Sequence, residues 1–90
     1  MEFEWDEAKA KRNRRKHNVD FDEAATVFAD FFSRTFPDPD HSDEEERFVT
    51  IGASCRGRVL AVAHTERYGR VRIISVRRAL PRERKAYEEN

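Results

Sequence analysis

The 90-residue chain has 18 basic and 18 acidic side chains, and 38% of its residues are apolar. This composition supports one small core and is not typical of intrinsic disorder, which combines few apolar residues with a high net charge. No apolar run approaches the ~20 residues of a membrane span. Met1–Asp6 contains neither a basic leader nor an apolar stretch, so we expect no signal peptide.

We therefore expect one cytoplasmic domain over residues 1–90, without membrane contact. Cys55 is the only cysteine, and the three histidines are scattered. This spacing excludes an internal disulfide framework and any standard zinc site. We accordingly expect no metal and no cofactor.

The N-terminal residues predict a short strand followed by a basic helix. Residues 3–5 alternate in the manner of a strand, and Asp6 is a good N-cap for a helix from Glu7 to His17. Asn18 tolerates the left-handed conformation that would close this helix.

A second helix and a strand are expected next. Asp20 is placed to cap this helix, and Glu23 follows three residues later, as in a capping box. Residues 31–36 are typical of a strand. The acidic, proline-containing residues 37–45 predict a loop.

The second half of the chain predicts a β-meander and a final helix. Three β-runs cover 47–54, 58–65 and 71–76. Gly57 and Gly69 lie in the two connections, so both connections are predicted to be hairpins. Pro81 is suited to the first position of a helix that continues toward Glu88.

The predicted element order is β-α-α-β-β-β-β-α, which defines an α+β domain with antiparallel strands packed against helices. Its charge is unevenly distributed. Residues 1–45 carry 7 basic and 13 acidic side chains, whereas residues 46–90 carry 11 basic and 5 acidic ones. Arginine outnumbers lysine by 14 to 4, and the planar fork of arginine matches phosphate.

The first predicted helix presents one polar face. At 100° per residue, its side chains Lys9, Asn13, Lys16 and His17 fall within an arc of roughly 100°. This face is either a site for an anion or a solvated surface.

Two strand ends also carry reactive side chains. The second run of the meander leads into His64-Thr65-Glu66-Arg67-Tyr68, which is either a site or an ordinary polar hairpin tip. The last strand ends in Arg77-Arg78. Regular alternation would place Arg77 on the face of Val71 and Arg78 on the opposite face.

An arginine-rich surface on a small α+β domain makes nucleic acid the leading ligand class. The last helix contributes Arg82 and Tyr87 to this surface, although the helix could also be merely solvent-exposed. The balanced total charge favours a single cationic face over a protein that coats DNA.

A set of motifs resembles the BrnT family of bacterial type II toxins from Phe3 to Tyr87. No single motif is diagnostic, but their order and spacing are specific together. The motifs are Phe3-Glu4-Trp5-Asp6, Lys9, Asn13, Lys16-His17, Phe21-Asp22-Glu23-Ala24, Val27-Phe28, Glu46-Arg47, Ile51-Gly52, Thr65-Glu66-Arg67, Arg72-Ile73-Ile74-Ser75, Arg77, Glu83-Arg84 and Tyr87.

The resemblance implies a RelE-like fold, with a compact antiparallel sheet and helices on one side. It implies a metal-independent endoribonuclease that cuts RNA and arrests translation and growth. The implied partner is a BrnA-like ribbon-helix-helix antitoxin, through which alone the complex would bind promoter DNA.

RNA cleavage without metal uses the 2′-OH as nucleophile and needs a base, an acid and cations around the phosphorane. Our candidates for the phosphate clamp are Arg67 and Arg77, which we expect to meet at one edge of the sheet. The candidates for proton transfer are His17, Glu66 and Tyr87. The candidates for RNA binding are Lys9, Asn13, Lys16, Arg78 and Arg82.

Two alternatives remain open on the sequence alone. The same surface would suit a non-catalytic module that only binds its partner, or a nucleic-acid-binding module acting on DNA by itself. In the toxin hypothesis, we expect a helical, acidic antitoxin segment to cover a surface that bears Lys16, Arg67 and Arg77.

Overall fold

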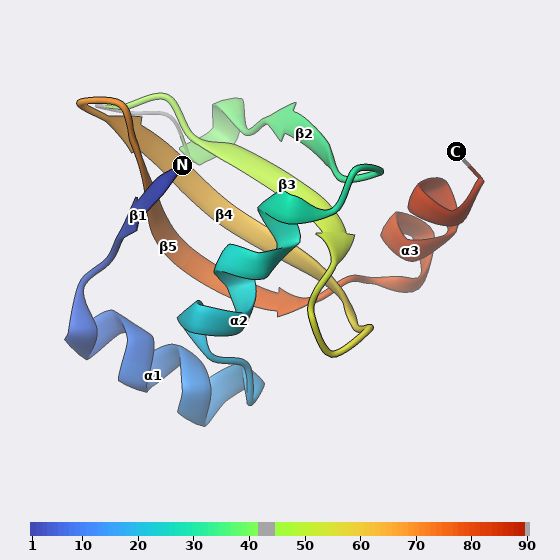
Figure 1. Cartoon of the computed structure of the whole chain (residues 1–90), viewed down its shortest axis with the longest axis horizontal. Coiled ribbons are helices and arrows are strands. Elements are labelled where there is room, and N and C mark those ends of the chain that lie inside the picture. Colours follow the sequence, from blue (N-terminus) through green and yellow to red (C-terminus); the bar gives the residue numbers. More distant parts are fainter. Residues whose placement is uncertain (42–44, 90) are drawn as a thin grey trace.

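The computed structural model describes residues 1–41 and 45–89 and shows a five-stranded sheet with helices on both faces (Figure 1). The predicted α+β class and element order are confirmed. The elements in chain order are β1 (Glu2–Glu4), α1 (Glu7–His17), α2 (Phe21–Thr26), a 3-10 turn η1 (Val27–Ala29), β2 (Arg34–Pro37), a 3-10 turn η2 (Pro39–His41), β3 (Phe48–Ala53), β4 (Val59–Arg67), β5 (Arg70–Arg78) and α3 (Pro81–Glu88).

The strands lie in the order β1-β5-β4-β3-β2. Strands β2 to β5 form the expected antiparallel meander, and β1 adds to β5 in the parallel direction. Gly57 and Gly69 have positive φ angles of 74° and 78°, as the predicted hairpins require. β2 is the outer strand at the end of the sheet opposite β1.

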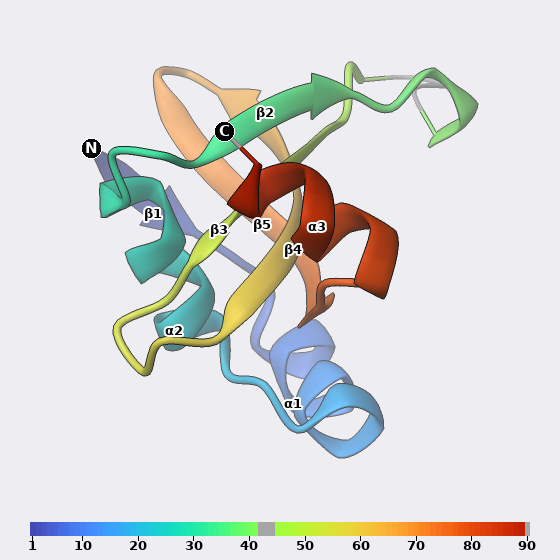
Figure 2. The same cartoon turned by 90° about the vertical axis from the view of Figure 1, so that its right-hand side faces the viewer.

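The two faces of the sheet are covered unequally. The main core lies between the sheet and the α1 and α2 helices, where Leu60, Val62, Ile73 and Val76 are almost fully buried. The opposite face bears α3, which covers only part of it (Figure 2). The resemblance implied helices on one side, so the position of α3 differs from that expectation.

A bulge in β5 changes the expected alternation of its side chains. Ser75 pairs with Ala63 and Ile73 pairs with His64, so Ile74 is left over. The extra residue shifts the period, and Arg77 therefore lies on the face opposite Ile73 instead of sharing it. The bulge directs Arg77 to the face that bears α3.

The caps of the two N-terminal helices differ from one another. α1 has the predicted bounds. At its start, the Asp6 side chain accepts a hydrogen bond from the Lys9 backbone N–H at 3.0 Å, and at its end the backbone of Asn18 is in the left-handed conformation, with φ 56°. The predicted capping box of α2 is wrong, because the Asp20 side chain makes no capping hydrogen bond. Glu23 is buried instead and bonds Ser54 and Arg58, which tie α2 to the β3–β4 hairpin.

The strand predicted over residues 31–36 begins later than expected. Phe31 and Phe32 form an exposed turn, and β2 begins at Arg34. The predicted loop contains η2, and part of it lies outside the described residues. Within the described part of the chain, no helix is long and apolar enough to cross a membrane.

Asn13 closes the free edge of β5 beyond its short pairing with β1. Its side-chain Oδ1 accepts from the Val76 N–H at 3.0 Å, and its Nδ2 donates to the carbonyls of Val76 and Val19 at 2.9 and 3.1 Å. The amide thus takes the place of a neighbouring strand and fastens α1 to the sheet.

Candidate active site

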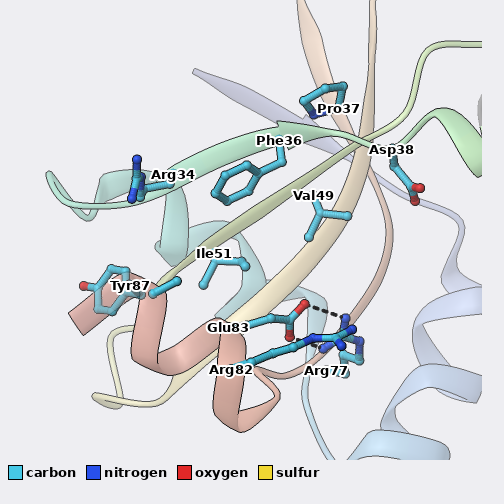
Figure 3. Close-up of a pocket in the computed structure, with 11 residues that line it drawn as sticks. Arg34, Phe36, Pro37, Asp38, Val49, Ile51, Arg77, Arg82, Glu83 and Tyr87 are labelled. Atoms are coloured by element: carbon cyan, nitrogen blue, oxygen red, sulfur yellow. Dashed lines mark hydrogen bonds and ion pairs between the residues drawn. The ribbon is translucent and has the colours of Figure 1, made fainter. Parts of the chain in front are cut away.

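A groove of about 510 Å³ lies between α3 and the open face of the sheet (Figure 3). Its apolar lining includes Phe36 of β2 and Val49 and Ile51 of β3. The remaining lining residues are Arg34, Pro37, Asp38, Arg77, Arg82, Glu83, Ala86 and Tyr87. Apolar and cationic groups therefore share one concave surface.

The N-terminal end of α3 is fixed by an ion pair inside the groove. Two parallel hydrogen bonds of 2.7 and 3.1 Å join the Arg77 guanidinium to the Glu83 carboxylate. Glu83 also accepts from the Leu80 backbone N–H at 2.8 Å, which caps the helix although Leu80 has no capping side chain. The Arg77 hydrogen bond lowers the pKa of Glu83, and Glu83 raises the pKa of Arg77.

The C-terminal end of α3 is fixed through Tyr87. Its hydroxyl donates to the Asp30 carboxylate, which also accepts the backbone N–H groups of Ala53 and Phe32 at 2.8 and 3.0 Å. Burial favours a higher pKa for Asp30, but these three hydrogen bonds outweigh it and lower the pKa. The same hydrogen bond raises the pKa of Tyr87. Asp30 therefore stays ionised and Tyr87 stays protonated.

The other two arginines of the groove form no salt bridge with a carboxylate among the described residues. Arg34 projects from β2, with its guanidinium carbon 5.9 Å from the centre of the Phe36 ring. Arg82 lies in the first turn of α3 and is exposed. With Arg77, they give the groove cationic groups beside an apolar surface, a combination that suits an anion with an apolar or aromatic part.

The structure brings together Arg77, Arg82 and Tyr87 of the sequence-predicted residues. The expectation that Arg67 meets Arg77 is wrong. Arg67 pairs with Arg70 at the closed end of the β4–β5 hairpin, whereas Arg77 pairs with Ala61. Six residues of β4 separate these positions, which is ~20 Å along the strand.

Glu66 and Arg67 lie at the hairpin end, outside the groove. Both are exposed, and Arg67 forms a salt bridge with Glu45 at 2.7 Å. This hydrogen-bonded pair raises the pKa of Arg67 and lowers that of Glu45. Arg78 is also exposed, but its register with Leu60 directs it away from the face of the groove.

The predicted polar face of α1 is divided by burial. Lys9 and Lys16 are exposed and His17 is half-buried, but Asn13 is only 7% exposed. The Asn13 amide is engaged with the backbone, so its position is structural and its side chain is unavailable to RNA. None of these residues lines the groove.

Sequence reasoning predicted only Arg77, Arg82 and Tyr87 of the lining residues, and it missed the polar and aromatic groups of Arg34, Phe36, Asp38 and Glu83. Arg34 and Phe36 are two residues apart on β2, so their side chains lie on the same face of the sheet. This spacing was visible in the sequence once the strand was predicted. Asp38 lines the same groove, and its carboxylate bonds His41 Nδ1 at 3.0 Å. In the sequence, this pair is marked only by its i,i+3 spacing.

His64 also follows an apolar strand, but the structure places it in the core against Phe28 and Phe48. Its Nε2 bonds the Thr50 hydroxyl at 2.7 Å. Burial lowers the pKa of His64 to about 4, so the ring is neutral near pH 7. This histidine belongs to the interior of the fold.

The fold and site define a small α+β domain with an arginine-lined groove beneath its C-terminal helix. The family model described as "Ribonuclease toxin, BrnT, of type II toxin-antitoxin system" matches residues 5–83. The chain belongs to this family of ribonuclease toxins.

A solved structure supports the assignment. The chain is similar to the Brucella abortus ribonuclease toxin BrnT, known from a crystal structure, with a TM-score of 0.70 and 25% sequence identity. The similarity covers 89% of this chain and 97% of the Brucella chain. No curated protein matches the chain.

Proposed function

We propose that this chain is an endoribonuclease that cleaves RNA in the groove beneath α3, without a metal ion, and so arrests translation and growth in the cytoplasm. A ribbon-helix-helix antitoxin neutralises it and alone links the pair to promoter DNA. The observation that carries the proposal is the convergence of three arginines on one groove, of which only Arg77 has a carboxylate partner in the described part of the chain.

The arginines would supply most of the catalytic effect. Attack by the 2′-OH places extra negative charge on the phosphorane, and guanidinium groups fixed in advance stabilise that charge. In the free chain, the pair with Glu83 positions Arg77 in the groove. Arg34 and Arg82 would bind flanking phosphates. The apolar floor around Phe36 would receive an unstacked base.

Proton transfer would fall to acids of the same groove. Glu83 is a weak base while Arg77 holds its pKa low. A substrate phosphate that binds Arg77 competes with Glu83, and the carboxylate then becomes a stronger base beside the scissile bond. Tyr87 stays protonated because its hydrogen bond to Asp30 raises its pKa, and it would act as the acid only after its hydroxyl leaves Asp30.

Independence from metal is supported by the donor set. Among residues 1–41 and 45–89, no three His, Cys, Asp or Glu side chains come together in a way that could hold a metal ion. Cleavage of a single-stranded RNA should therefore continue in EDTA. Full inhibition by the chelator, reversed by a divalent ion, would contradict this part of the proposal.

Arg77→Ala tests the groove directly. We expect kcat/KM to fall about 100-fold or more, mainly through kcat, because a transition-state contact is lost. Arg67→Ala is the matched control, since it removes an arginine that also bonds a carboxylate but lies at the hairpin end. Equal activity of the two variants would refute the placement of the active site in the groove.

A further inference from the structure

The turn before β2 exposes two adjacent aromatic rings. Phe31 and Phe32 are 91% and 59% exposed, and their ring centroids lie 5.4 Å apart in an edge-to-face arrangement. The turn is fixed by Asp30, whose side chain accepts from the Phe32 N–H and whose carbonyl accepts from the Ser33 N–H. A fixed pair of exposed aromatic rings is typical of a protein-binding surface.

The same rings lie at the beginning of a free sheet edge. β2 pairs with β3 on one side, and no described strand pairs with its other side. Such an edge offers unpaired backbone donors and acceptors to an extended segment of another protein. Figure 2 shows this outer side of β2 uncovered, with α3 beneath the strand.

The charge of this edge selects an acidic occupant. Arg34 lies between the Phe32 and Phe36 positions and forms no salt bridge with a described carboxylate. β2 itself contains no acidic residue. Pairing of β2 with β2 in a second copy of this chain would therefore bring no carboxylate from that strand to Arg34.

We infer that the antitoxin adds an extended acidic segment to the free edge of β2, with an apolar side chain on Phe31 and Phe32 and a carboxylate on Arg34. The consequence of this binding, inhibition of RNA cleavage, rests on the proposed function. Arg34 and Phe36 also line the groove, so a segment on this edge covers one wall of the RNA site. Inhibition then follows from occupation of the groove wall by the antitoxin.

Titration calorimetry of the chain with a purified ribbon-helix-helix protein from an adjacent reading frame tests the surface. The double substitution Phe31→Ser and Phe32→Ser should weaken binding at least 30-fold, because both rings are anchors of the contact. Tyr68→Ser is the matched control, since Tyr68 is fully exposed at the β4–β5 turn. It should change the affinity less than twofold.

Hydrogen exchange of the complex tests the mode of binding. Strand addition should slow exchange at the outward backbone amides of residues 34–36, and unchanged exchange there would refute it. The double variant should also retain the melting temperature and RNA cleavage rate of the free wild-type chain, because neither phenylalanine contributes to the core or the groove.

Besides unchanged hydrogen exchange at residues 34–36, three results would overturn the inference. The first is antitoxin affinity unchanged by the double substitution, and the second is equal weakening by Tyr68→Ser. The third is a wild-type dimer in the absence of antitoxin that the double substitution dissociates, which would assign the edge to a second copy. The binding measurements do not depend on whether the chain cleaves RNA. Failure of the ribonuclease proposal would therefore appear in the cleavage assay alone.

Discussion

Replacement of Asn13 by alanine tests the role of this residue as a closing group for β5. The substitution removes three hydrogen bonds to the backbone, with lengths of 2.9 to 3.1 Å. It leaves the N–H and carbonyl of Val76, a residue with 0% exposure, without these partners in the interior.

The magnitude follows from these lost partners. An intramolecular hydrogen bond contributes about 0.5–1.5 kcal/mol net, and an unsatisfied buried donor costs about 1–3 kcal/mol. The better helix propensity of alanine offsets several tenths of a kcal/mol. We therefore expect the free energy of unfolding to fall by about 3 kcal/mol, a decrease of roughly 10–25 °C in Tm for a domain of this size.

Urea denaturation of Asn13→Ala and Lys16→Ala, followed by circular dichroism, measures the effect. Lys16 is exposed on the same helix, so its substitution should change the free energy of unfolding by no more than about 0.5 kcal/mol. A similarly small change for Asn13→Ala, combined with weaker RNA binding by the folded variant, would refute the structural role and restore Asn13 to the RNA surface.

Two further predictions concern the core and α3. His64 is protonated in the unfolded chain below pH ~6.5 but in the folded chain only near its lowered pKa of about 4, so the free energy of unfolding should decrease by up to about 3 kcal/mol as the pH falls through this window. The pH profile of His64→Gln, measured by urea denaturation, should lack this component, and identical profiles would contradict it. Tyr87→Phe removes the hydroxyl that binds Asp30 and should accelerate amide exchange in α3 while lowering RNA cleavage less than Arg77→Ala. Unchanged protection of α3 would show that this hydrogen bond does not hold the helix.

Local signals were sufficient for most of the fold. The bounds of α1 follow from Asp6 and Asn18, which act on the neighbouring backbone, and the hairpins follow from glycines in their turns. Glu23 shows the limit of such signals. Its spacing from Asp20 is that of a capping box, but a partner 35 residues away binds its carboxylate instead.

The candidate site was only partly predictable for a related reason. A hairpin places the end of its first strand opposite the beginning of its second, so the separation of Arg67 and Arg77 was implicit in the predicted topology. The face of the sheet on which Arg77 lies could not be predicted, because no glycine or proline in the sequence marks the bulge at Ile74. The groove itself depends on where α3 docks, which no local pattern specifies.

The Arg77–Glu83 pair couples the docking of α3 to the occupation of the groove. The carboxylate of Glu83 both receives the Arg77 guanidinium and caps the first turn of α3. An anion that binds Arg77 competes with this carboxylate and weakens the hold of the sheet on that end of the helix. By linkage, a firmly docked α3 must in turn weaken anion binding. Tyr87 and Asp30 fix the other end of α3 independently, so the first turn can yield to an anion while the helix stays attached to the sheet.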